Sequence, residues 1–95
     1  MVSIICQVEI LIYESKSLKE KRSVIKSIIN KTKSKFCISI IESDYHDYWQ
    51  KTKLGFSLCS IDSSHALKKY QEIIKYIESS PYIEIYNIEK EEIVL

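Results

Sequence analysis

Glycine and proline are almost missing from this 95-residue sequence, which contains one of each, Gly55 and Pro81. Flexible linkers, collagen-like repeats and low-complexity tails need many more of these residues, so the sequence excludes all three. It also lacks any run of about 18 apolar residues, which a membrane-spanning helix needs. The N-terminus lacks the basic segment and cleavage site of a secretory signal peptide. We therefore predict one globular domain over residues 1–95 that does not enter a membrane.

Residues that form disulfides or bind metals are also scarce. The sequence has three cysteines and two histidines, and no two cysteines form a CxxC motif. Because three is an odd number, at least one thiol has no intramolecular partner, which favours a reducing compartment, the cytoplasm. The spacing matches no metal site, no cysteine–histidine pair and no serine triad. The sequence thus predicts no metal, no cofactor and no catalytic residues.

Apolar residues, in contrast, are abundant and regularly spaced. Alternation of apolar and polar residues predicts strands, and a 3.6-residue period predicts helices. The resulting order, β-α-β-β-α-β, indicates an α+β ferredoxin-like fold, with two helices on one face of a four-stranded antiparallel sheet. Right-handed crossovers place the first and third strands in the centre. The predicted strands cover residues 2–13, 36–40, 53–59 and 83–95, with a bulge near Asn87, and the predicted helices cover residues 17–35 and 62–79.

Ser17 and Glu20 form a capping-box sequence at the start of the first helix. We expect the Ser17 hydroxyl to accept a hydrogen bond from the Glu20 amide. The Glu20 carboxylate is expected to accept one from the Ser17 amide in return.

The connection between the second and third strands makes two further details predictable. Matching their apolar residues places Ile40 opposite Phe56, and the same register places Cys37 opposite Cys59. We expect two free thiols there, because a direct cross-strand bridge is strained and the cytoplasm is reducing. Trp49, the one tryptophan, lies in this connection and is expected to fill the core beneath it.

Three blocks of sequence stand out: SLKEKR at residues 17–22, FCISIIE at residues 36–42 and DYWQKTKLG at residues 47–55. Together they resemble the YlxP-like family of small bacterial proteins of unassigned function, over essentially the whole chain. The resemblance implies a single ferredoxin-like domain with no agreed catalytic residues. Genes of the family often lie among genes for transcription elongation, translation initiation and ribosome maturation, which implies a role linked to RNA or the ribosome. The family more often has Asn where Cys37 stands here.

Positive charge is concentrated in one segment, although the net charge of the chain is only +1. Residues 16–35 contain eight basic residues and one acidic residue, a local charge of +7, so the rest of the chain carries −6. Four of the basic residues share one stripe of the helix, whose N-terminus itself attracts anions. The stripe indicates either contact with RNA phosphates or an ordinary solvated helix face. The candidate anion-binding residues are Lys16, Lys19, Lys21, Arg22, Lys26 and Lys33.

The sheet face away from the helices carries several apolar residues. An exposed apolar patch favours a partner, commonly a second copy of the chain, and the alternative is scattered surface hydrophobes. The candidate residues of a homo-oligomer interface, such as that of a homodimer, are Ile5, Leu11, Ile41, Tyr82 and Tyr86.

Taken together, the sequence favours a non-catalytic accessory factor that contacts RNA or the ribosome through its first helix. The central strands display no rings for base stacking, so recognition is expected to use backbone charge and shape. The alternative is an interaction module that forms oligomers through its open sheet face, without RNA contact.

Overall fold

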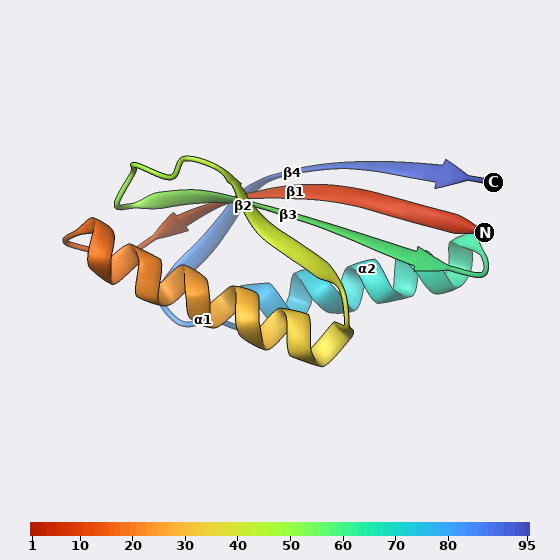
Figure 1. Ribbon diagram of the computed structural model, residues 1–95, viewed down its shortest axis with the longest axis horizontal. Coiled ribbons are helices and arrows are strands. Elements are labelled where there is room, and N and C mark those ends of the chain that lie inside the picture. The colour runs from red at the N-terminus through yellow and green to blue at the C-terminus, as the bar shows by residue number, and fades with distance from the viewer.

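The elements follow the expected order in the computed structural model, which describes residues 1–95. Both helices lie on one side of a four-stranded antiparallel sheet, and the other side of the sheet is open (Figure 1). This arrangement confirms the α+β ferredoxin-like fold. The elements are β1 (Val2–Ile12), α1 (Leu18–Phe36), β2 (Ser39–Asp44), β3 (Lys51–Ser60), α2 (Ser63–Glu78) and β4 (Ile83–Val94).

The strand order is β2-β3-β1-β4, so the first and third strands occupy the centre as predicted. The register between β1 and β4 shifts once along their length. Glu9 pairs with Asn87, and the next residue, Ile10, pairs with Ile85. Tyr86 is thereby left without a partner and forms a bulge, which confirms the irregularity predicted near Asn87.

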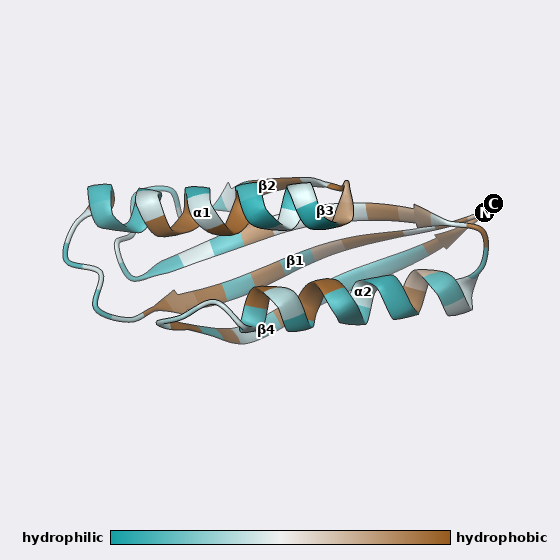
Figure 2. Ribbon diagram, turned by 90° about the horizontal axis from the view of Figure 1, so that it is seen from below, coloured by the Kyte–Doolittle hydropathy of each residue, from teal (hydrophilic) through white to brown (hydrophobic).

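The hydrophobic core lies between the sheet and the two helices. The even-numbered residues of β1, from Val2 to Ile12, are each no more than 3% exposed. Each helix turns an apolar stripe towards the sheet and a polar side towards solvent (Figure 2). Because fully burying one aliphatic side chain contributes about 1.5–3 kcal/mol, this layer is the main source of stability.

β2 begins later than the sequence pattern predicted. Phe36 is the last residue of α1, and Cys37 ends the helix in the left-handed conformation, with a φ of 52°. The Cys37 amide donates to the carbonyl oxygen of Lys33 at 2.9 Å, as is typical of a left-handed helix end. The strand expected over residues 36–40 is therefore wrong at its start.

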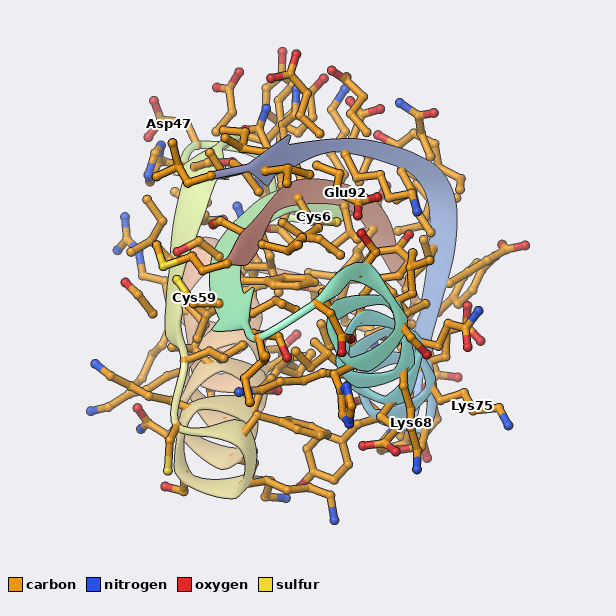
Figure 3. The ribbon with its side chains drawn as sticks, turned by 90° about the vertical axis from the view of Figure 1, so that its right-hand side faces the viewer. Cys6, Asp47, Cys59, Lys68, Lys75 and Glu92 are labelled. Carbon is orange, nitrogen blue, oxygen red and sulfur yellow. The ribbon has the colours of Figure 1, made fainter.

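The predicted register between β2 and β3 survives this shift, because Ile40 pairs with Phe56. Cys37, however, precedes the strand, so the expected facing pair of Cys37 and Cys59 is wrong. All three cysteines are free thiols, of which Cys6 is buried. Figure 3 shows Cys6 between the sheet and the helices.

The two ends of the chain lie side by side at one end of the sheet (Figure 1). The Met1 amino group donates to the Leu95 carbonyl oxygen at 2.7 Å. The Leu95 amide donates to the Met1 carbonyl oxygen at 2.9 Å. The loop between β2 and β3 lies at the opposite end. Neither helix combines the length and apolar character needed to cross a membrane.

Candidate nucleic-acid interface

Helix α1 begins with a modified capping box. The Ser17 hydroxyl accepts from the Glu20 amide at 3.1 Å, as predicted. The Glu20 carboxylate accepts from the amide of Lys16 at 2.6 Å, one residue before the expected donor. These two bonds satisfy free amides at the helix start and fix the direction in which the chain enters α1.

Five basic side chains form an exposed surface along α1 and at its start. None of the five takes part in an ion pair within the molecule. Val24, Ser27 and Lys31 lie on the flank of α1 that faces a groove beside the α2–β4 turn. At 100° per residue, the four basic side chains within the helix lie on the opposite flank. The surface therefore points away from α2. We call it the basic face; its members are Lys16, Lys19, Arg22, Lys26 and Lys33.

Lys21 does not belong to the basic face, so its assignment to an RNA contact is wrong. Its side chain is fully buried, with Nζ 2.9 Å from a carboxylate oxygen of Glu42. The same ammonium group donates to the carbonyl oxygens of Tyr45 and His46. Lys21 lies within the buried stripe of α1, in line with Ile25, Ile28 and Thr32, so its side chain points inward. The end of β2 and the two residues that follow it supply the oxygens that a buried cation needs.

Thr52 binds the same carboxylate oxygen of Glu42 that faces Lys21. The Thr52 hydroxyl donates to Glu42 Oε2 at 2.5 Å, and Thr52 itself is fully buried. No buried side-chain polar atom of the molecule lacks a hydrogen-bond partner. A satisfied polar network thus ties the second turn of α1 to β2, β3 and the loop between them.

Residues 45–50, which we call the aromatic loop, fold over the open face of the sheet. Tyr45 adopts a left-handed φ of 62°, and its hydroxyl donates to Glu9 on the open face of β1 at 2.7 Å. The Tyr48 ring packs edge-on against that of Tyr45, with centroids 5.5 Å apart. Lys51 places its ammonium group 4.3 Å from one ring centroid and 4.4 Å from the other. Cation–π contact of this kind adds to the order of the loop.

The contact between Tyr45 and Glu9 also sets their protonation. The hydrogen bond to the Glu9 carboxylate raises the pKa of Tyr45 to about 12. In turn, hydrogen bonds from Tyr45 and then from Asn87 lower the pKa of Glu9. Glu9 therefore holds the loop as a carboxylate, bonded to the loop on one side and to β4 on the other.

Trp49 is exposed, so the prediction that it fills the core is wrong. Its side chain and that of Tyr48 are 51% and 53% exposed. They line a hollow of about 520 Å³ together with Leu11 of β1 and the polar residues Asp47, Gln50 and Lys51. The sequence did contain a signal for this position: no aliphatic residue occurs between Asp44 and Lys51, which is typical of a surface loop.

The open sheet face holds most of the residues predicted for an oligomer interface. Ile5, Ile41 and Tyr86 are 48%, 59% and 45% exposed. Leu11 is half-buried beside the aromatic loop. Tyr82 is wrongly assigned, because it precedes β4 in a left-handed turn and lines the groove beside α1 instead.

Residues 4–90 match the protein family described as "Protein of unknown function (DUF503)". The chain belongs to this family. A relative from Bacillus subtilis (strain 168), described as "Uncharacterized protein YlxP", is 41% identical over 76 residues, which are 80% of this chain and 83% of the relative. The resemblance to YlxP-like proteins is thereby confirmed, and it places no functional residue.

Two solved structures resemble the fold of this DUF503 protein. The de novo designed protein Foldit4 superposes with a TM-score of 0.54 at 10% identity, covering 98% of each chain. A REP-associated tyrosine transposase, in a structure bound to a REP hairpin, superposes with a TM-score of 0.51 at 14% identity. That match covers 98% of this chain and 56% of the transposase chain. At these identities the likeness shows the fold alone.

Proposed function

We propose that this DUF503 protein is a non-catalytic accessory factor that contacts structured RNA, free or in the ribosome, through the basic face of α1. The observation that carries the proposal is that all five cations of this face are exposed and none is paired with a carboxylate. Phosphates are the partners that such a row of cations suits, because each contact releases condensed counterions from the nucleic acid.

The distribution of charge over the molecule supports the same proposal. Acidic residues gather on β4, whereas α1 contains one, Glu20. Glu20 is already occupied by the capping bonds at the helix start. A duplex backbone that approaches α1 therefore meets little repulsion along the basic face.

A charge-reversal experiment tests the RNA contact. We compare Arg22→Glu/Lys26→Glu in the basic face with Lys68→Glu/Lys75→Glu, which reverses two exposed lysines on α2 (Figure 3). Fluorescence anisotropy measures binding to a labelled RNA hairpin at several salt concentrations. We expect the first variant to lose roughly tenfold or more in affinity and to lower the slope of log K against log salt by about 2. Absence of binding at low salt, or equal loss in both variants, would overturn the proposal.

We also propose a cytoplasmic location and association with the ribosome. Three free thiols, two of them exposed, favour a reducing compartment. Sedimentation of lysate with and without nuclease tests the association: the protein is expected to sediment with ribosomes and to leave that fraction after nuclease treatment. A protein that stays at the top of the gradient in both samples contradicts ribosome association.

We propose self-association as a second candidate function, through the free edge of β4. This strand has 12 residues and pairs on one side only, with β1. Its residues Ile88, Ile93 and Val94 are 37%, 44% and 67% exposed. A long edge with exposed apolar side chains is a template for pairing with another chain, most simply a second copy.

One antiparallel register suits a second copy best. Lys90 and Glu92 lie on the helix side of β4, since they pair with the core residues Cys6 and Ile4. If a two-fold axis passes through Glu91, Lys90 of one copy lies opposite Glu92 of the other, and Ile88 lies opposite Val94. The symmetry forms each of these pairs twice. Such cross-strand pairs contribute about 0.2–1 kcal/mol each. The cost of this register is that the two Glu91 side chains meet at the axis.

Light scattering at several concentrations tests this edge. Lys90→Glu is expected to shift the mass towards the monomer, and Lys90→Glu/Glu92→Lys to restore the dimer, because the swap keeps the opposite charges facing each other. Glu91→Gln is expected to strengthen the dimer. Ile5→Lys is the control for the open sheet face: if it alone dissociates the dimer, the interface is the open face and not the edge. A wild type that is monomeric at the highest concentration contradicts self-association altogether.

A further inference from the structure

We infer that the aromatic loop binds an unpaired base of the RNA, stacked against Trp49 and Tyr48 in the hollow beside Leu11. The inference rests on the proposed RNA contact and adds the kind of nucleotide that this end of the molecule selects. This base contact would be made by the aromatic loop and not by the central strands, because the open faces of β1 and β3 carry no aromatic side chain.

The hollow offers the surfaces that a nucleobase needs. Two aromatic side chains stand about half exposed, where burying them is the usual outcome for a folded chain. Its volume of about 520 Å³ falls within the range of roughly 300–1,000 Å³ for small-ligand sites. Leu11 supplies an apolar wall, while the Gln50 amide and the Asp47 carboxylate offer polar atoms for the edge of a base.

The loop is already ordered before any ligand binds. The Ile12 amide donates to the carbonyl oxygen of Gln50 at 2.7 Å, which extends the pairing of β1 into the loop. Lys21 holds the loop from below and Glu9 from the sheet. A loop whose backbone is already fixed loses little conformational freedom on binding, so stacking on its rings is favoured.

The loop and the basic face meet at one end of the molecule. Lys21, which bonds the loop carbonyls, is followed directly in the chain by Arg22, and Lys19 lies two residues before it. Figure 1 shows the first turns of α1 and the loop at the same end, far from the chain termini. A phosphate backbone on the basic face therefore brings neighbouring nucleotides to the loop.

These positions favour an RNA in which unpaired nucleotides adjoin a duplex. Bases within a duplex stack on one another and hide their faces, whereas bases in a hairpin loop or bulge expose them. Stacking on aromatic side chains is tolerant of sequence, because every base has a π-face. The loop should therefore select unpaired over paired RNA, with little preference for the sequence.

Trp49 reports directly on the inferred contact, because it is the one tryptophan in the chain. We titrate the protein with an RNA hairpin that has a six-nucleotide adenosine loop and with a blunt RNA duplex of equal charge. The hairpin is expected to quench the tryptophan fluorescence and the duplex to leave it unchanged. Trp49→Leu is expected to lower affinity for the hairpin by roughly 5- to 100-fold and affinity for the duplex little. Trp49→Phe, which keeps a ring, should retain most of the hairpin affinity.

The outcomes separate this inference from the proposed function. If both RNAs bind equally, fluorescence does not change and Trp49→Leu binds like wild type, the base contact is wrong while the backbone contact stands. If Arg22→Glu/Lys26→Glu binds both RNAs like wild type, the basic face is not the RNA site, and the inference fails with it.

Discussion

Lys21 places a fully buried ammonium group between α1, the end of β2 and the aromatic loop. Removing its charge leaves the Glu42 carboxylate without its cation and two carbonyl oxygens without a donor. Breaking a buried ion pair from one side costs about 3–5 kcal/mol, and the partial exposure of Glu42 places this case at the lower end. We therefore expect Lys21→Met to lower the free energy of unfolding by about 3 kcal/mol in urea denaturation.

Two variants complete that experiment. Lys21→Met/Glu42→Gln is expected to recover part of the loss, because no unpaired carboxylate remains and Thr52 keeps an acceptor. Lys26→Met, at an exposed position of the same helix, should stay within about 0.5 kcal/mol of wild type. If Lys21→Met and Lys26→Met change the free energy of unfolding equally, the buried network around Lys21 does not stabilise the fold more than an exposed lysine does.

The three thiols should differ strongly in reactivity. Burial raises the pKa of Cys6 to about 11, so this thiol stays protonated near neutral pH, whereas Cys37 and Cys59 are exposed. Because the thiolate is the reactive form, a disulfide reagent should modify two thiols of the folded protein quickly and the third only after denaturant is added. Rapid modification of three thiols in the folded state would contradict the burial of Cys6.

At the scale of elements, the end of α1 is the position at which a single substitution should stabilise the fold. Cys37 adopts a left-handed conformation there, which costs a residue with a side chain about 1–2 kcal/mol. Glycine removes that cost and loses about 0.5–1 kcal/mol through its freedom in the unfolded chain. We expect Cys37→Gly to raise the free energy of unfolding by up to about 1 kcal/mol. Cys59→Gly, the same change in β3, should lower the free energy of unfolding. If both variants change this free energy in the same direction, the helix end is not strained.

The same helix end shows how far the sequence predicts the elements. Alternation and helical periodicity gave the order of all six elements, the central strands and the bulge near Asn87, because burial on one face leaves a regular pattern. They failed at Phe36 and Cys37, where the alternating run FCISI satisfies the strand pattern although Phe36 is the last residue of α1 and packs edge-on against Tyr76 of α2. A left-handed cap depends on backbone geometry that a Cys side chain does not signal, whereas Gly or Asn at that position would have indicated it.

The positions of the candidate site residues were predictable for exposed side chains with few contacts, and were not predictable for side chains whose burial depends on tertiary contacts. The basic face followed from charge and helical spacing, since its members touch little else. Lys21 was misassigned because its burial depends on Glu42 and on two loop carbonyls, which come close only in the folded chain. Trp49 was misassigned because apolar size favours the core in general, whereas this loop is held on the open face by Tyr45.

For the whole molecule, the free energy of unfolding depends on pH because a thiol and a phenol group lose their protons less readily in the folded state than in the unfolded chain. Burial raises the pKa of Cys6 from 9.0 to about 11, and the bond to Glu9 raises that of Tyr45 to about 12. Above about pH 9 the unfolded chain has released protons that the folded protein still holds, so rising pH favours unfolding. We expect the free energy of unfolding to fall between pH 9 and pH 11.

Urea denaturation at pH 8, 9, 10 and 10.5 measures this fall. Cys6→Ala removes the thiol and should flatten the fall, whereas Cys59→Ala, which removes an exposed thiol, should leave it unchanged. An equally steep fall in Cys6→Ala and wild type would assign the whole effect to the tyrosines.

The neighbouring chain ends make the order of the elements open to rearrangement. Since Met1 and Leu95 already exchange main-chain hydrogen bonds, a short glycine-rich bridge between them needs no change in the sheet. A circular permutant opened in the turn between β3 and α2 would keep the same neighbours, with new ends at the same end of the molecule as the old ones. Affinity tags and dyes attached there, or at the present ends, would lie at the opposite end of the molecule's 43 Å long axis from the aromatic loop.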